Sequence, residues 1–179
     1  KQIQVPDDVE SANCMYCGHR ILIQGQMQQH TVAAPSVQNL LGMARTATLG
    51  GNSEEALSYY NRVLEINPAI SEAWIGKGKA AAWQSSLADM RFSEMLVAFQ
   101  HAIGSSEENE RASVIEECQS EVNQVVVALY NLARENLLEF VSLQDSWASY
   151  LNQIDVLLCA LESALQWNER DHTTLENII

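Results

Sequence analysis

The chain of 179 residues contains little glycine, little proline and few basic side chains. Its 8 glycines and 3 prolines are few for the many tight turns of a β-sandwich or a β-barrel. Ten lysines and arginines stand against 23 aspartates and glutamates, and they are scattered, so a basic stripe for a nucleic-acid backbone is missing. No apolar run reaches the roughly 18 residues of a membrane-spanning helix. The sequence therefore disfavours β-rich folds, nucleic acid as a partner, and a membrane location.

The residues that are abundant favour helices. Hydrophobic residues make up 47% of the chain, enough for a sizeable core, and Ala, Leu, Val, Glu, Gln and Ser dominate. The net charge of −13 predicts an acidic, solvated surface that can also select basic partners. Of the four cysteines, Cys14 and Cys17 form a CxxC, whereas Cys118 and Cys159 lie in apolar helix patterns as small hydrophobes. This spacing differs from a secreted disulfide scaffold and favours a reducing, cytoplasmic compartment.

The sequence divides into an irregular start and a long helical remainder. Residues 1–25, which contain the CxxC, are expected to form a small zinc-ribbon-like segment, and residues 26–35 a linker. Amphipathic periodicity then continues to the end of the chain. We expect an all-α fold here, with helical repeats over 36–104, a long helical extension or cap over 105–179, and no β-sheet in either part.

Four helices are predicted within residues 36–104. Gly50–Gly51 can end the first helix, and Asn52 followed three residues later by Glu55 resembles a capping box that opens the second. The second helix is expected to stop at Asn67–Pro68, since the residue before proline avoids the α region.

Long helices are predicted over residues 105–179. The acidic side chains between residues 107 and 121 are expected to be solvated and to complement the helix dipole. A weak break is expected near Asp145, which can cap a new helix, and Thr173 with Glu176 resembles another capping box. The sequence stops shortly after this box, at two apolar residues, and we expect the natural protein to continue.

The first and third predicted helices show a repeat of 34 residues, with the related pairs Leu40 and Trp74, Ala44 and Gly78, and Ala47 and Ala81. This is the spacing of tetratricopeptide (TPR) repeats, and the segment SEEALSYYNRVLEINP resembles the second helix of such a repeat. The resemblance covers roughly residues 37–104. It is weaker in the second unit, where Lys77 replaces an apolar residue, about five extra residues fall within Trp83–Met90, and the closing proline is missing. It implies helical hairpins in which small residues permit close approach and large ones, Trp74 included, are buried.

The TPR resemblance implies a protein-interaction scaffold. Such arrays present a groove lined by the first helix of each pair, which holds a peptide or a protein. Arg45 and Lys79 are 34 residues apart and occupy equivalent places on two first helices. As partner-binding residues they would form a local positive strip for a peptide carboxylate or an acidic segment. The alternative is that each side chain only extends along the surface.

The motif CMYCG, with Cys14 and Cys17, resembles one knuckle of a zinc ribbon. Structural zinc takes four ligands and the sequence supplies one CxxC, so the resemblance implies a second knuckle before Lys1 or in another chain. Two alternatives are a site completed by His19 or His30 and a metal-free turn. A thioredoxin-like redox role is disfavoured because no βαβ pattern surrounds the motif.

A second functional hypothesis follows from this motif: a zinc-ribbon regulatory or nucleic-acid-associated module whose helices serve oligomerisation. The run Ile21–Ile23 suits the strand that follows a knuckle. The acidic total argues against nucleic acid, whereas a homo-oligomer remains compatible with either hypothesis. No nucleophile–base pair or phosphate loop is legible, so we expect no enzymatic activity.

Overall fold

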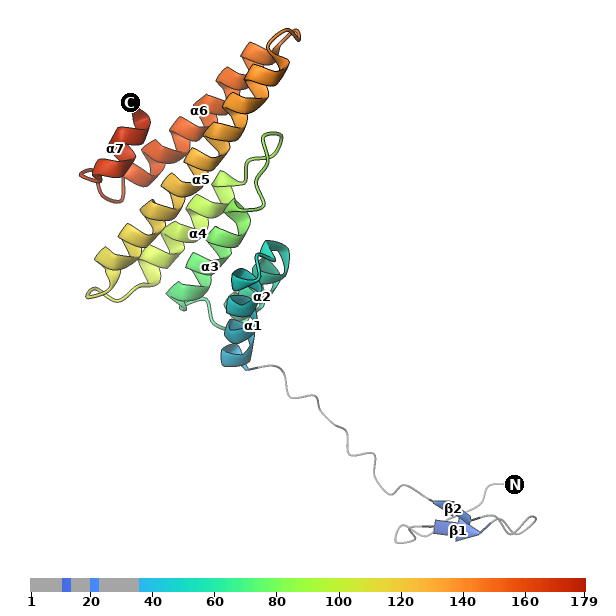
Figure 1. The fold of residues 1–179 in the computed structure, drawn as a ribbon. Helices are drawn as coiled ribbons and strands as arrows, with labels where there is room; N and C mark the ends of the chain where they lie inside the picture. The colour runs from blue at the N-terminus through green and yellow to red at the C-terminus, as the bar shows by residue number, and fades with distance from the viewer. Residues whose placement is uncertain (1–10, 14–19, 23–35) are drawn as a thin grey trace. The chain divides into compact units, whose positions relative to one another are not determined.

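The computed structural model describes residues 11–13, 20–22 and 36–179 (Figure 1). The chain separates into two compact units, Lys1–Ser36 and Val37–Ile179. Each unit is described by itself below.

In the first unit, strand β1 (Ser11–Asn13) pairs antiparallel with strand β2 (Arg20–Leu22). Ala12 lies opposite Ile21 in this register. The prediction of a short strand after the CxxC is therefore confirmed for Arg20–Leu22, one residue earlier than the run that predicted it.

The second unit is all-α, as its periodicity predicts, and residues 36–179 contain no strand. Its helices are α1 (Val37–Leu49), α2 (Ser53–Ile66), α3 (Ser71–Ala82), α4 (Phe92–Ser105), α5 (Arg111–Phe140), α6 (Ser146–Leu165) and α7 (His172–Ile178). Among the described residues, no helix is both long enough and apolar enough to cross a membrane.

Successive helices of this unit pack against one another, and alternate helices also meet. Thus α1 contacts α3, α3 contacts α5, and α4 contacts α6. The long helices α5 and α6 form a hairpin whose turn projects beyond α4, and the short α7 folds back onto the hairpin nearer its base (Figure 1). The helices α1, α3 and α5 therefore lie next to one another in this order, with α3 in the middle.

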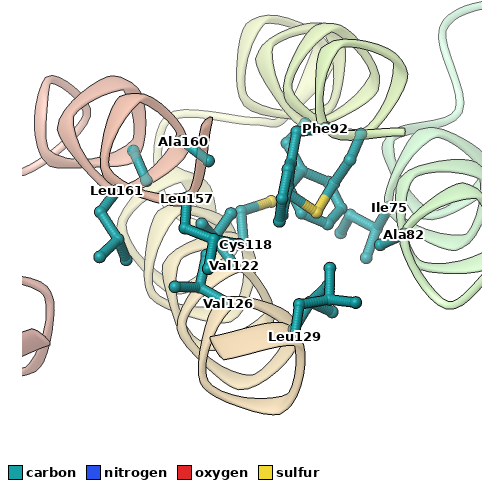
Figure 2. Packing of buried hydrophobic residues seen from close by; sticks show 14 of the residues in the cluster. Ile75, Ala82, Phe92, Cys118, Val122, Val126, Leu129, Leu157, Ala160 and Leu161 are labelled. Carbon is teal, nitrogen blue, oxygen red and sulfur yellow. The ribbon is translucent and has the colours of Figure 1, made fainter. Parts of the chain in front are cut away.

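The unit has two cores. One lies between α1, α2 and α3, and the other between α3, α4, α5 and α6, so the helices after residue 105 share a core with α3 and α4. In Figure 2, Cys118 and Val122 of α5 lie between Phe92 of α4 and Leu157 of α6. Burial of each large apolar side chain stabilises the fold by about 1.5–3 kcal/mol. Cys118 is fully buried, as predicted, whereas Cys159 is exposed, so its prediction as a buried hydrophobe was wrong.

The start of α2 follows the local prediction closely. Gly51 adopts a positive φ of 72°, which glycine tolerates without a steric penalty, and it ends the turn after α1. Asn52 caps α2, because its Oδ1 accepts from the backbone N–H of Glu55 at 3.3 Å. The Glu55 carboxylate accepts from the Asn52 side-chain amide at 2.9 Å instead of from its backbone, so half of the predicted capping box forms.

The later helix starts follow the sequence less closely. α5 ends at Phe140 and α6 begins at Ser146, which confirms the predicted break; Asp145 precedes α6 with a φ of 70° and its side chain makes no capping bond. The box predicted from Thr173 was wrong. Asp171 caps α7 instead, accepting from the Thr174 N–H at 2.8 Å.

Small residues of α3 admit aromatic rings from both neighbouring helices, which permits the close approach expected at Gly78. A Cβ on Gly76 would lie 2.1 Å from Cζ of Tyr60 on α2, and a Cβ on Gly78 would lie 2.4 Å from Cε1 of Phe99 on α4. Both rings therefore occupy space that any side chain at these positions would need.

Trp74 is partly buried at the edge of the core, short of the full burial that was predicted for it. It packs against the edges of both cores, and its ring stacks on the exposed His101 with centroids 4.5 Å apart. Its Nε1 donates to the carbonyl of Pro68 at 2.8 Å. The indole seals the junction between the two cores at the surface.

Candidate interaction face of helices α1, α3 and α5

An ion pair joins α1 to the first turn of α3. The Nε of Arg45 donates to Oε1 of Glu72 at 2.5 Å, and its Nη2 donates to Oε2 at 2.6 Å. This two-point contact fixes the orientation of the guanidinium, and it raises the pKa of Arg45. Both side chains are about half exposed, so solvent screens the pair and its contribution to stability is small.

A second, better-shielded cluster joins α3 to α5. The Nζ of Lys79 lies 2.9 Å from Oε1 of Glu117 and 3.4 Å from Oε2 of Glu121. Partial burial acts to lower the pKa of Lys79, but the hydrogen bond to Glu117 and the charge of Glu121 outweigh it, and the pKa is raised. Lys79 therefore stays charged throughout the neutral range.

Glu121 also accepts a hydrogen bond from Trp83, at the start of the α3–α4 loop. Trp83 directly follows α3, and its Nε1 donates to Oε1 of Glu121 at 2.6 Å. The Glu121 side chain is only 10% exposed, whereas 52% of Trp83 is exposed. The carboxylate thus anchors the indole N–H and leaves much of the ring free to contact another molecule.

A pocket of about 540 Å³ opens beside this cluster. It is lined by residues of α1, the α1–α2 turn, α2, α3 with the residue that follows it, and α5, namely Thr48, Gly51, Ser53, Ala56, Lys79, Ala80, Trp83, Glu121 and Gln124. Its volume lies within the range of about 300–1,000 Å³ that ligand sites occupy. Apolar carbon, hydroxyl, amide and charged groups all line it, so it can hold a side chain with a polar end.

The wall of the pocket is held by hydrogen bonds that cross between elements. Gln84 donates from Nε2 to the carbonyls of Ser53 and Ala80, at 3.2 and 2.7 Å. Arg91 in turn donates to Oε1 of Gln84 at 2.8 Å and to Glu94. The loop after α3 is thereby tied to the start of α2, which fixes the position of Trp83.

The two predicted partner-binding residues both lie at contacts between these helices. Arg45 is paired with one carboxylate and Lys79 with two, so neither adds an unpaired positive charge to the face. The carboxylates of Glu72, Glu117 and Glu121 outnumber the two cations. Carboxylates of the chain itself therefore neutralise the positive strip that was expected from Arg45 and Lys79. Contact of either residue with a partner stays a prediction.

The predicted zinc ligands, Cys14 and Cys17, lie outside the described residues. Strand β1 ends at Asn13, directly before the motif, and β2 begins at Arg20, shortly after it. Within the described parts of the chain, no group of three or more His, Cys, Asp or Glu side chains is placed to hold a metal ion.

Sequence reasoning missed Trp83 and Glu121. Trp83 was assigned to the extra residues that interrupt the repeat, and Glu121 to a solvated acidic run. The available signal was a spacing of four residues on two helices, between Lys79 and Trp83 and between Glu117 and Glu121, which places each pair on one helix face. That the two faces meet depends on how the helices pack.

Comparison with known proteins leaves the family open. No protein-family model matches the chain, and no curated protein matches it in sequence. We therefore derive the function from the residues of the chain itself.

Proposed function

We propose that this chain is a protein-interaction scaffold that binds a peptide segment of a partner on the face formed by α1, α3 and α5. In this proposal α1–α4 are two TPR-like hairpins, and α5 with α6 takes the place of a third. The contacts of α1 with α3 and of α3 with α5 support it, because first helices of successive TPR units adjoin in this way. Three hairpins also meet the usual minimum of about three repeats for a stable array.

The observation that carries the proposal is the pocket beside Trp83. A tryptophan that is half exposed, yet held by a hydrogen bond to a buried carboxylate, is pre-ordered for contact. Tryptophan is among the residue types that dominate binding energy at protein interfaces, and a fixed ring loses little side-chain entropy on binding. The neighbouring pocket gives room for a side chain of the bound segment.

Charge selects the kind of segment. Arg45 and Lys79 are neutralised within the chain, and the Glu117 carboxylate, which shares Lys79 with Glu121, is 48% exposed. An indole face attracts cations, and a nearby carboxylate adds to that attraction. A lysine or arginine of the partner therefore suits this face better than the acidic segment expected from Arg45 and Lys79 alone.

Selection from a random displayed peptide library against the purified chain tests this proposal. Selected peptides should be enriched in Lys and Arg, and calorimetry should show binding that weakens with added salt. Trp83→Ala should weaken binding by about tenfold or more, as expected of an interface hot spot. Glu117→Gln should weaken the binding of basic peptides by a smaller factor.

Val97→Ala is the matched control, because Val97 is a half-exposed apolar residue on α4 that does not line this pocket. It should leave affinity unchanged. Selected peptides that bind Trp83→Ala and Glu117→Gln as tightly as the natural chain would exclude this face as the binding site.

We also propose that Cys14 and Cys17 bind zinc, with the remaining ligands from a second knuckle. The antiparallel pairing of β1 and β2 on either side of the motif supports this, because a zinc knuckle lies at the turn of a short hairpin. A bound zinc ion would supply the folding energy that so short a hairpin lacks.

A further inference from the structure

The turn end of the α5–α6 hairpin carries an uncovered apolar surface. Six large side chains there are 42% to 64% exposed: Tyr130, Leu138, Val141, Leu143, Trp147 and Leu151. We call these six residues the tip patch. Exposed apolar groups in such a cluster mark an interaction surface, because scattered single residues are what an ordinary surface shows.

Most of the tip patch lies on a single face of the hairpin. Tyr130 and Leu138 are eight residues apart on α5, and Val141, three residues further, directly follows its last residue with helical dihedral angles. This spacing keeps all three on one side of the helix. Trp147 and Leu151 are four residues apart at the start of α6, and the ring of Trp147 contacts that of Tyr150 edge-on. Leu143 closes the patch from the connecting turn.

The same face is covered by α7 nearer the base of the hairpin. Asn123 of α5 donates to Oγ1 of Thr174 at 2.8 Å and accepts from Asn177 at 2.7 Å, which seats α7 on α5. Tyr130 lies seven residues further along α5, about two turns, and therefore on the same side. A helix, α7, thus already packs on this face, and it covers only the part near the base of the hairpin (Figure 1).

An apolar hollow marks the place where α7 ends and the uncovered face begins. It has a volume of about 440 Å³ and is lined mainly by apolar side chains, among them Tyr130, Ile154 and Leu158 of the hairpin and Ile178 and Ile179 of the chain end. Tyr130 lines this hollow and also belongs to the tip patch, so the apolar hollow beside α7 adjoins the tip patch.

Charge indicates what covers the tip patch. Between residues 140 and 154, Asp145 is the only charged side chain, in a chain whose net charge is −13. Two copies of the chain repel each other through most of their surface, and this repulsion is weakest where carboxylates are fewest. The α5 part of the patch does carry charge, because the exposed Arg134 is four residues from both Tyr130 and Leu138 and lies on the same face. The connecting turn and the start of α6 are therefore the nearly uncharged part of the surface, and a second copy offers the same apolar part in return.

The dimensions of the hairpin also fit a second copy. The free part of α5 beyond α7, from Val127 to Phe140, is about 20 Å long at 1.5 Å per residue. Two such hairpins packed face to face form a four-helix bundle, the common way in which helix pairs bury apolar faces. A stable interface buries roughly 800 Å² on each partner, and the six side chains, at 42% to 64% exposed, would form its apolar centre.

We propose that the tip patch is a homodimerisation surface, on which two α5–α6 hairpins pack around a two-fold axis as a four-helix bundle. In each copy the partner's hairpin tip then continues the layer that α7 begins. The surface is isologous, because the same six residues contribute from both copies. This inference is independent of peptide binding, since none of the six residues lines the pocket beside Trp83.

Sedimentation equilibrium of the full chain at micromolar concentrations tests the proposal. We expect a monomer–dimer equilibrium that shifts toward dimer with added salt, because salt screens the repulsion between two acidic copies and leaves apolar burial intact. The double variant Trp147→Glu, Leu151→Glu buries unpaired carboxylates at the interface. It should raise the dimer dissociation constant by more than about a hundredfold.

Leu49→Glu is the matched control, because it places the same charge on a 90% exposed apolar residue of α1 and should leave the dimer intact. Trp147→Ala with Leu151→Ala is a milder pair that retains good helix formers. It should weaken the dimer by about tenfold or more, with circular dichroism unchanged. A chain that stays monomeric, or a dimer that tolerates the alanine pair with intact helices, overturns the proposal.

Discussion

The indole Nε1 of Trp83 and the ammonium of Lys79 meet the two oxygens of one carboxylate, that of Glu121, at 2.6 and 3.4 Å. Glu121 therefore connects the end of α3 to α5 and fixes the aromatic ring beside the pocket. A carboxylate so enclosed is costly to desolvate, and it is retained in the fold because both of its oxygens have a donor.

Replacement of Glu121 by alanine should lower the free energy of unfolding by about 1–3 kcal/mol, because the Trp83 N–H and Lys79 both lose a partner. Glu121→Gln keeps an acceptor for the indole and should cost less. Urea unfolding followed by circular dichroism measures both. Glu117→Gln, at an exposed partner of Lys79, should change stability by about 0–1 kcal/mol. Equal losses of unfolding free energy for all three variants would show that Glu121 does not make the main polar contact between α3 and α5.

Alkaline pH should destabilise the fold through Cys118. Burial, with a smaller contribution from the Glu117 charge, raises the pKa of its thiol from 9.0 to about 12. In the unfolded chain the thiol ionises near pH 9, whereas in the folded chain it remains protonated. The unfolded state therefore holds fewer protons in this range, and stability falls as the pH rises from 9 toward 12.

Cys118→Ala should be less stable than the natural chain at neutral pH, because it leaves a small cavity, but it should lose less stability above pH 9. Lys79, whose pKa is also raised, loses its stabilising charge at alkaline pH in both proteins, so the difference between them isolates the thiol. Parallel curves of unfolding free energy against pH would contradict this assignment.

Gly78→Ala should destabilise the protein, although alanine is the better helix former. The new Cβ would lie 2.4 Å from Phe99, and forcing this core apart costs about 1–3 kcal/mol, more than the roughly 1 kcal/mol gained in helix propensity. Gly42→Ala on α1 is the control, because no atom lies within 4 Å of its Cβ position. It should stabilise by about 0.5–1 kcal/mol. Thermal unfolding distinguishes the two variants. A Gly78→Ala variant that is more stable than the natural chain would show that Phe99 does not pack closely against Gly78.

The zinc content of the purified chain distinguishes the three interpretations of the CxxC, which are a site completed by a second knuckle, a site completed by a histidine, and a metal-free turn. If two copies each contribute Cys14 and Cys17, elemental analysis should find about one zinc ion for every two chains, since structural zinc takes four ligands. Cys17→Ser should abolish zinc binding, and Cys159→Ser, at an exposed cysteine of α6, should leave it unchanged. About one zinc ion per chain would favour a site completed by His19 or His30.

Local signals in the sequence determined the existence and the ends of most helices. Gly50–Gly51 ended α1, Asn52 opened α2 and Pro68 followed the end of α2, because glycine, a capping amide and proline act within a few residues. The spacing of small and large residues predicted close approach of neighbouring helices, which occurs at Gly78 of α3, although its aromatic neighbour Phe99 was not predicted. The all-α class followed from the same short-range periodicity.

Only the tertiary structure decided which side chains meet across helices. The sequence gives Lys79 and Glu121 as charges 42 residues apart, and their contact depends on how α5 rotates against α3, which core packing sets. The rotation of α5 also buries Cys118, whereas the rotation of α6 exposes Cys159, although both cysteines lie in apolar patterns. Periodicity assigns a residue to a face of its own helix, whereas the neighbour that covers that face is chosen by packing over the whole fold.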